Sequence, residues 1–315
     1  MSREPRKRFI AVLGPTASGK SALSLALARR LGGEIINCDS TAVYRGLDIG
    51  TDKVPMAARL GIPHHLIDVA EPTETYTAAR FAADAARAVR EIDARGRVAI
   101  LVGGTGLYYR ALTRGLFAGP GRDAGLRARL YAIAERRGPE RLHRWLARVD
   151  EASALRIQPR DTQRMVRALE VYLLTGKPLT SHFDDTRQPL PEFEPIAIGL
   201  APERTQIAAR VAARVDQQFD AGIVREIETL IASGVPREAH AFSGLVYRQV
   251  LEMLAGVRGE TETRALIVQE NLRYAKRQLI WFRKEPNLRW IPATGEIDST
   301  IEAALVAVAA PDHDS

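Results

Sequence analysis

The sequence has a single cysteine, Cys38, among 315 residues. One cysteine cannot form an internal disulfide bond, and it excludes zinc modules built from several cysteine ligands. No apolar run approaches the length needed to cross a membrane, and residues 1–8 lead into the first expected strand without the pattern of a cleavable signal. We therefore expect a cytoplasmic protein of a reducing compartment, with no membrane partner.

Lysine is scarce among the basic residues, so the formal net charge of +7 is carried mostly by arginine. Arginine suits phosphate groups because its planar fork can bind two oxygen atoms at once. The charge alone leaves two interpretations open, namely a polyanionic partner and a merely solubilising surface. The hydrophobic content of 46% is that of a globular protein with a sizeable core.

A phosphate-binding loop lies near the start of the chain, between an expected strand at 9–13 and an expected helix at 21–31. It fits the pattern G-x-x-x-x-G-K-[ST] at every fixed position: Gly14, Pro15, Thr16, Ala17, Ser18, Gly19, Lys20 and Ser21. Such a loop points backbone N–H groups at anionic oxygens, while Lys20 adds a charge and Ser21 a hydroxyl group suited to Mg²⁺. The pattern does not distinguish a nucleotide from another pyrophosphate.

A carboxylate and a hydroxyl group follow the second expected strand, at Asp39 and Ser40 after residues 34–38. In an open parallel sheet, ligands bind at the carboxyl ends of the strands, on the side of the phosphate loop. Asp39 is therefore the leading candidate for chemistry. The alternative is that Asp39 only caps a turn, which is common for an Asp-Ser pair.

The third expected core strand, at 98–102, ends in Gly103, Gly104 and Thr105. Many ATPases hold Mg²⁺ with an aspartate at this place, and its absence argues against a motor or switch that hydrolyses a nucleoside triphosphate. We expect the two glycines to leave room for a ligand close to the backbone, beside the hydroxyl group of Thr105.

Alternation of apolar strands and helices predicts an α/β fold, with a mainly parallel sheet flanked by helices. Residues 117–195 differ, because helical patterns dominate there and arginines are dense. We expect an all-helical insertion over 117–195 that interrupts a catalytic core formed by 1–116 and 196–315.

Within the expected insertion, Arg160, Arg164 and Arg167 are spaced to share one face of a helix. Cations on a common face resemble a contact to a phosphate backbone. Local ion pairs to Asp161 and Glu170 are an equally good interpretation.

The last long expected helix, at 262–282, interleaves basic and aromatic residues, as nucleic-acid surfaces do. Packing of Trp281 and Phe282 in the core is the alternative for the aromatic rings. The basic residues that we expect at RNA here are Arg273, Lys276, Arg277 and Arg283.

Taken together, these motifs resemble the bacterial tRNA dimethylallyltransferases, in order and over nearly the whole chain. The likeness rests on the phosphate loop, Asp39-Ser40 with Val43-Tyr44, Asp48-Ile49-Gly50-Thr51, His64-His65-Leu66-Ile67-Asp68, Gly103-Gly104-Thr105-Gly106-Leu107-Tyr108, Arg160-Asp161 with Gln163-Arg164, Arg167-Ala168-Leu169-Glu170, and Ala275-Lys276-Arg277-Gln278 with Trp281-Phe282-Arg283.

The resemblance implies transfer of a dimethylallyl group from dimethylallyl pyrophosphate to N6 of the adenosine 3′ of a tRNA anticodon, position 37, by a monomer that uses Mg²⁺. The loop residues would hold the pyrophosphate and, through Ser21, its Mg²⁺, with Lys20, Arg210 and Arg214 stabilising the leaving group. Asp39 would accept the N6 proton and Thr105 would help to hold the reacting groups. The tRNA would contact Ser40, Arg160, Gln163, Arg164, Arg167 and the basic residues of the last long helix.

Three positions depart from the family pattern: Ala42 replaces a usual Gln, Val246 a usual Gly and Ile280 a usual Thr. Ala42 removes one polar group near the target nucleotide, and Val246 stands where it would shift a turn.

Two rival functions share some of these features. A P-loop small-molecule or nucleoside kinase would also combine an ATP-binding loop with an acceptor-binding Asp39, but the arginine-dense insertion favours RNA over a metabolite. A non-catalytic RNA-binding protein with a nucleotide-sensing loop has no use for Asp39 and Thr105 beside that loop.

Overall fold

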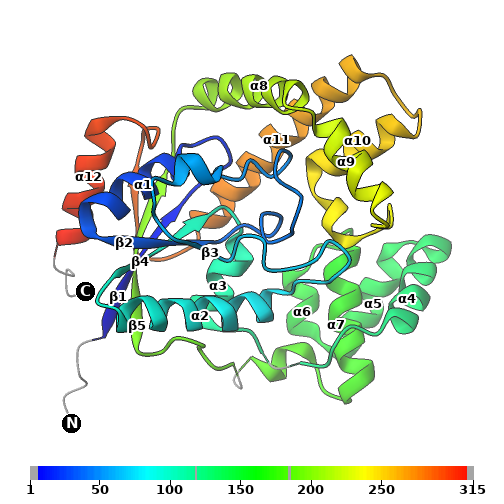
Figure 1. Ribbon diagram of the computed structural model, residues 1–315. Coiled ribbons are helices and arrows are strands. Elements are labelled where there is room, and N and C mark those ends of the chain that lie inside the picture. The colour runs from blue at the N-terminus through cyan, green and yellow to red at the C-terminus, as the bar shows by residue number, and fades with distance from the viewer. Residues whose placement is uncertain (1–5, 118, 184–185, 311–315) are drawn as a thin grey trace, which may run out of the picture. The chain divides into compact units, whose positions relative to one another are not determined.

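The computed structural model describes residues 6–117, 119–183 and 186–310. The chain forms two compact units, one made of Met1–Thr113 and Pro189–Ser315 and the other of Arg114–Gln188. We call them the core unit and the helical unit and describe each by itself (Figure 1). None of the helices in the described residues is long and apolar enough to cross a membrane.

The core unit is built on a six-stranded sheet with the order β3-β2-β4-β1-β5-β6. Every pair of neighbouring strands is parallel, which confirms the predicted fold class. The strands are β1 (Lys7–Leu13), β2 (Gly33–Asn37), β3 (His64–His65), β4 (Val98–Gly103), β5 (Phe193–Leu200) and β6 (Leu288–Ile291).

Helices cover both faces of this sheet, and its central strands are therefore mostly apolar, with β1 buried from Phe9 to Leu13. Successive side chains of β1 point to opposite faces. Ile10 and Val12 pack in a cluster with α1 (Lys20–Leu31) and α12 (Asp298–Ala309). Phe9 and Ala11 belong to a larger cluster on the other face, with residues of α2 (Ala78–Ala94) and α3 (Gly106–Arg114).

The remaining helices of the core unit follow β5. The long helix expected at 262–282 is confirmed as the second half of a helical pair, α8 with α11, that contributes to the functional site. These helices are α8 (Arg204–Asp220), α9 (Ile223–Ala232), α10 (Leu245–Leu254) and α11 (Glu260–Phe282).

The helical unit contains no strand among its described residues. Its α-helices are α4 (Ala124–Arg137), α5 (Pro139–Val149), α6 (Glu151–Arg156) and α7 (Thr162–Thr175). They enclose an apolar cluster that includes Leu130, Leu142 and Leu169. This compact unit ends at Gln188, before the boundary expected at 195, because Phe193 already pairs with Lys7 in the sheet.

A buried carboxylate, Glu170, joins the helices of this unit. Its oxygens accept hydrogen bonds from Arg127 Nε at 2.8 Å, Arg167 Nη1 at 2.7 Å and the backbone N–H of Asp123 at 2.9 Å. Burial alone would raise the pKa of Glu170, but the hydrogen bonds from Arg127 and Arg167 outweigh it and lower the pKa to about 2.

Replacing Glu170 with glutamine is expected to destabilise the chain by about 3 kcal/mol at neutral pH, because it leaves Arg127 and Arg167 without their counter-ion. The folded-state pKa lies below the unfolded one, so the carboxylate stabilises above about pH 4.5 and loses this effect as the pH falls toward 2. Denaturant unfolding at several pH values should therefore show the gap between wild type and variant narrowing over that interval. The control is Glu135→Gln, an exposed change on α4, which should alter neither the free energy of unfolding nor its pH dependence. If the difference in free energy between wild type and Glu170→Gln does not change with pH, Glu170 is not the charged partner of Arg127 and Arg167.

Candidate functional site

A cavity of about 910 Å³ opens in the core unit at the carboxyl ends of β1, β2 and β4. The phosphate loop, the segment after β2, and helices α8 and α11 contribute its walls. It therefore brings together Lys20, Asp39 and Arg214, which lie far apart in the sequence.

The phosphate loop has the backbone conformation of an anion-binding turn. Gly14, Ala17 and Gly19 all have positive φ, at 148°, 61° and 84°. At Gly14 a side chain would also collide with the backbone oxygen of Leu200, 2.8 Å from the place of a Cβ, so glycine is required there. The Ser18 hydroxyl group is buried and has no hydrogen-bond partner among the described residues, so it can bond to an oxygen of a bound ligand.

Lys20 is the fixed lysine of this loop and the first residue of α1. Its Nζ donates to the backbone oxygen of Pro15 at 2.5 Å. Burial and, next, the charge of Arg214 lower the pKa of Lys20 to about 8. An anion bound in the loop would offset both effects.

Two arginines of α8 reach the phosphate loop, at the positions expected from the sequence. Arg214 donates to Thr16 Oγ1 at 3.0 Å and forms an ion pair with Asp52 at 2.8 Å. Arg210 donates to the backbone oxygen of Ala17 at 2.7 Å and pairs with a carboxylate of the loop before α12, Glu296. Contacts with the protein itself thus hold both guanidinium groups at the loop.

Asp39 uses one carboxylate oxygen as a turn cap. Its Oδ1 accepts from the backbone N–H of Thr41 at 2.8 Å and from Thr41 Oγ1 at 2.6 Å, so the capping interpretation holds for that oxygen. Its Oδ2 has no hydrogen bond within the described ranges, and Asp39 lines the cavity. Nearby, Thr105 Oγ1 accepts from the backbone N–H of Ser40 at 3.1 Å, which fixes Thr105 beside the same turn.

The glycines after β4 serve the packing of the chain on itself. A Cβ at Gly103 would collide with the backbone of Cys38, and one at Gly104 would collide with the amide of Gln278. The protein thus occupies the Cβ side of each glycine, while Gly103 and Gly104 both also line the cavity, so the expectation that they leave room for a ligand stays a prediction.

Sequence reasoning missed Gln278 as part of the site. Its Oε1 accepts from the backbone N–H of Thr16 at 2.8 Å, and its Nε2 donates to the backbone oxygen of Gly104 at 2.9 Å. Gln278 thereby ties the phosphate loop to the turn after β4. One helical turn earlier on α11, Tyr274 lines the cavity, and burial, followed by the charge of Asp39, raises its pKa. The signal for both was their i, i+4 spacing on the basic helix.

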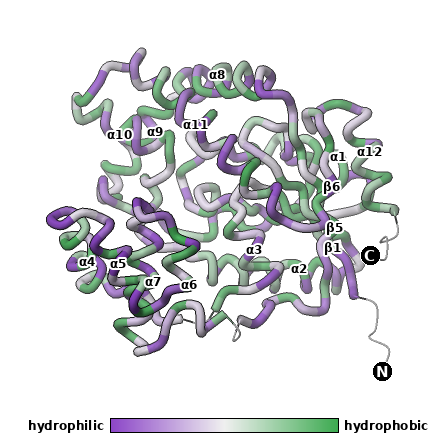
Figure 2. The backbone as a smooth tube through the Cα atoms, turned by 180° about the vertical axis from the view of Figure 1, so that it is seen from behind, coloured by the Kyte–Doolittle hydropathy of each residue, from purple (hydrophilic) through white to green (hydrophobic). Residues whose placement is uncertain are grey.

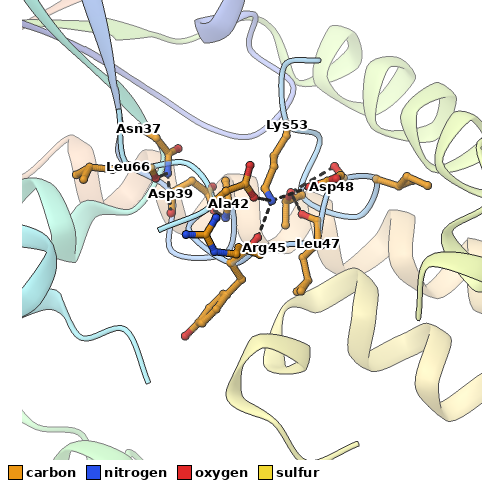
Figure 3. A network of polar contacts seen from close by, with 12 residues as sticks. Asn37, Asp39, Ala42, Arg45, Leu47, Asp48, Lys53 and Leu66 are labelled. Carbon is orange, nitrogen blue, oxygen red and sulfur yellow. Dashed lines mark hydrogen bonds and ion pairs between the residues drawn. The ribbon is translucent and has the colours of Figure 1, made fainter. Parts of the chain in front are cut away.

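The segment after β2 is held by a buried lysine, Lys53 (Figure 3). Its side chain is 4% exposed, and its Nζ contacts Tyr44 O at 2.6 Å, Asp48 Oδ1 at 2.7 Å and Asp68 Oδ1 at 2.6 Å. The carboxylates of Asp48 and Asp68 thus offset the cost of burying the charge of Lys53. These contacts explain why Asp48 and Asp68 occur in the loop motifs.

Glu226 of α9 anchors the same segment at Asp48-Ile49-Gly50. Its Oε2 accepts from the backbone N–H groups of Asp48 at 2.9 Å and Ile49 at 2.8 Å. Tyr247 donates to Glu226 Oε1 at 2.7 Å, and its ring leaves no space for a side chain at Gly50. This buttress positions the loop that carries the partner of Arg214.

The structure has a place for each of the three residues that depart from the family pattern. Ala42 is buried in the turn capped by Asp39. Val246 lies in the first turn of α10, where its backbone is helical, so it shifts no turn. Ile280 is exposed on α11.

The predicted arginine face of the helical unit is only partly present. Helix α7 begins at Thr162 with Asp161 as its N-cap, so Arg160 precedes the helix and the prediction of one face shared by three arginines is wrong. Arg164 pairs with Asp161 at 3.4 Å, and Arg167 binds the buried Glu170. The alternative of local ion pairs is thus confirmed for Arg164 and Arg167, while Gln163 lies in the first turn of α7.

The basic residues of α11 remain available for an anionic partner. Arg273, Lys276, Arg277 and Arg283 are exposed, and none has a carboxylate partner in the part of the chain that the structure describes. Arg273 and Arg277 also line the cavity. Of the two aromatic residues, Phe282 is fully buried, as the packing alternative predicts, and Trp281 lies under the guanidinium group of Arg110 at 4.5 Å.

Comparison with known proteins gives a consistent result. A family model described as "IPP transferase" matches residues 42–285. The tRNA dimethylallyltransferase of Geobacter metallireducens is 44% identical to this chain, over 97% of this chain and 99% of its own length. That of Koribacter versatilis is 45% identical, over 95% of each chain.

Solved structures agree with these sequence relatives. The full-length tRNA isopentenylpyrophosphate transferase of Bacillus halodurans superposes with a TM-score of 0.71 at 36% identity, over 97% of this chain and 96% of that one. A eukaryotic dimethylallyltransferase described as acting on tRNA has a TM-score of 0.77 at 27% identity, over 95% of this chain and 78% of that one.

Proposed function

The chain belongs to the IPP transferase family, and on that premise we propose that it is a tRNA dimethylallyltransferase that modifies N6 of the adenosine 3′ of the anticodon, position 37. Dimethylallyl pyrophosphate is the donor, and the products are N6-dimethylallyladenosine and pyrophosphate. The observation that carries the proposal is that one cavity brings together the phosphate loop, Arg214 and Asp39, whose Oδ2 accepts no hydrogen bond in the described chain.

The phosphate loop suits a pyrophosphate leaving group. Breaking the allylic C–O bond leaves negative charge on the pyrophosphate, and cations already fixed in place lower the energy of that charge. Lys20 and Arg214 supply two such cations, and the unpartnered hydroxyl group of Ser18 supplies a hydrogen-bond donor. The remaining loop residues and Arg210 complete the proposed pyrophosphate site.

The acceptor half of the reaction belongs to Asp39 and Thr105. The N6 amine forms the new C–N bond as the C–O bond breaks, and it then loses one proton. Asp39 accepts that proton at Oδ2, since its Oδ1 is engaged with Thr41. The target adenine must leave its stack to enter a cavity at the edge of a sheet.

Magnesium fits this site as an ion brought in with the pyrophosphate. No group of three or more His, Cys, Asp or Glu side chains among the described residues could hold a metal, so the protein offers no cage of its own. Mg²⁺ is commonly bound by one or two protein groups together with phosphate oxygens, and Ser21 is the residue that would hold it. When bound, it would neutralise charge on the leaving group.

The tRNA is the macromolecular partner in this proposal. We assign its binding to the insertion predicted at 117–195, to Ser40 and to the basic residues of α11. A monomer working in the cytoplasm, where tRNA is modified, is sufficient for the reaction.

One assay tests the function. The protein is incubated with labelled dimethylallyl pyrophosphate, Mg²⁺ and unmodified tRNA, and in parallel with labelled ATP and the same tRNA. We expect label from dimethylallyl pyrophosphate alone to enter tRNA, and nuclease digestion should recover it as N6-dimethylallyladenosine. Transfer of phosphate from ATP would instead indicate a kinase, and absence of dimethylallyl transfer would refute the proposal.

A further inference from the structure

The phosphate loop has two edges, which contact different parts of the core unit. At one edge, Thr16 Oγ1 accepts a hydrogen bond from Arg214 at 3.0 Å. At the other, the backbone oxygen of Ala17 accepts from Arg210 Nε at 2.7 Å, and Gly19 follows two residues later. We call these the Thr16 edge and the Gly19 edge.

The proposed acceptor residues lie on the side of the Thr16 edge. Gln278 joins Thr16 to the backbone oxygen of Gly104, in the turn after β4. The next residue of that turn, Thr105, accepts a hydrogen bond from the backbone N–H of Ser40, which adjoins Asp39. A donor bound in the loop must therefore extend its organic chain over the Thr16 edge to reach the acceptor.

A short segment between β6 and α12, residues 292–297, packs on the Gly19 edge, and we call it the strap. Figure 2 shows α12 beside α1, the helix that begins at the phosphate loop, and apolar residues of both helices share one cluster. The backbone N–H of Gly295 donates to the oxygen of Ser18 at 3.0 Å. A Cβ at Gly295 would collide with the backbone oxygen of Gly19, so glycine permits this close approach.

The strap places a carboxylate, Glu296, directly beside the phosphate loop. A Cβ built at Gly19 would lie 2.5 Å from Glu296 Oε2. The other oxygen, Oε1, pairs with Nη2 of Arg210. The side chain of Glu296 is 41% exposed and lines the cavity. A negative charge thus stands at the Gly19 edge, where a ligand in the cavity can meet it.

The position of this charge bears on which phosphate compounds the loop can hold. A diphosphate ester carries one organic substituent and one free terminal phosphate. If its organic chain leaves over the Thr16 edge, its terminal phosphate points to the Gly19 edge, where Arg210 attracts it. A third phosphate would extend further along this edge and bring more negative charge toward the carboxylate of Glu296, which repels it.

We propose that Glu296 restricts the phosphate loop to diphosphates and excludes triphosphates such as ATP. The inference rests on the proposed function, which assigns the loop to the pyrophosphate group of the donor. Glu296 is a specificity residue, because it touches neither the acceptor nor the bond that breaks. Its charge supplies the distinction that the loop pattern lacks, since that pattern is shared by proteins that bind nucleotides.

The test removes the charge with Glu296→Gln, whose amide oxygen can still accept the hydrogen bond from Arg210. The control is Glu302→Gln, an equal change of charge on α12, where the exposed carboxylate pairs with Arg30 at 3.5 Å. Calorimetric titration gives the dissociation constants of inorganic pyrophosphate, inorganic tripolyphosphate and ATP at one Mg²⁺ concentration, in 50 and 300 mM salt. Thermal unfolding of each protein reports any loosening of the strap.

We expect Glu296→Gln to bind tripolyphosphate at least about tenfold more tightly than wild type at low salt, and pyrophosphate at most about threefold more tightly. ATP should follow tripolyphosphate, and the differences should narrow at 300 mM salt, because salt screens the repulsion between exposed charges. The control should keep the wild-type dissociation constants.

Two results would overturn the proposal. Equal tightening for pyrophosphate and tripolyphosphate would mean that Glu296 only competes for Arg210. A lower unfolding temperature with an unchanged ratio of the two dissociation constants would mean that it only holds the strap. These titrations need no group transfer, so if the ratio changes as expected while no dimethylallyl group reaches tRNA, the proposed function fails and the assignment of Glu296 stands.

Discussion

Replacing Asp39 with asparagine is expected to lower kcat for dimethylallyl transfer by about 10²–10⁴, while the affinity for tRNA stays at its wild-type value. The amide oxygen of asparagine can still accept the hydrogen bonds from Thr41, so the turn is kept. What is lost is the charge of the carboxylate and the oxygen that has no hydrogen bond in the described chain, in a residue that lines the cavity. Single-turnover kinetics with saturating tRNA and donor measure this chemical step directly.

The control for Asp39 is Thr41→Val, which removes one hydrogen bond to Oδ1 and leaves the carboxylate. We expect this variant to lose some stability and to keep a kcat within a few-fold of wild type. If Asp39→Asn has near-normal turnover while Thr41→Val does not, Asp39 is a turn cap and the base must be sought elsewhere.

The phosphate loop and the strand and helix that flank it were predictable because their signals are local. A glycine-rich pattern between an apolar run and a helix fixes loop, strand and helix at once, and residues 14–21 adopt the expected conformation. The same reasoning placed Asp39 and Thr105 at one edge of the sheet. For Gln278, helical spacing shows which residues share its face but not its contact with Thr16, which lies 262 residues away in the sequence.

Charges were harder to interpret, because spacing shows which residues share a face but not which have partners. Arg167 fits the predicted basic face, yet it is committed to Glu170, and Arg160 leaves the face because Asp161 caps the helix. Arg141 and Arg144, which no sequence motif marks, have no carboxylate partner in the described chain. The sequence offers local ion pairs only as one alternative, and what selects it for Arg167 is a tertiary contact, the burial of Glu170 against Arg127 of α4.

Replacing Arg214 with glutamine is expected to reduce kcat/KM for dimethylallyl pyrophosphate by about 10²–10³. Arg214 is bonded to Thr16 of the phosphate loop, so its charge stands where the leaving pyrophosphate gathers negative charge. An arginine that stabilises this charge acts more strongly in the transition state than on the bound donor, and kcat should carry most of the loss. Arg214→Lys keeps a point charge without the planar fork and should recover part of the rate.

The variant Asp52→Asn tests whether Arg214 acts on the leaving pyrophosphate or serves only as the ion-pair partner of Asp52. It removes the carboxylate that faces Arg214 at 2.8 Å and leaves the guanidinium group in place. Because Asp52 competes with pyrophosphate for the same cation, its loss should tighten the inhibition constant of pyrophosphate and leave kcat within a few-fold of wild type. If pyrophosphate inhibits Arg214→Gln as strongly as wild type, Arg214 serves only to hold the loop, and the leaving-group role passes to Lys20 and Arg210.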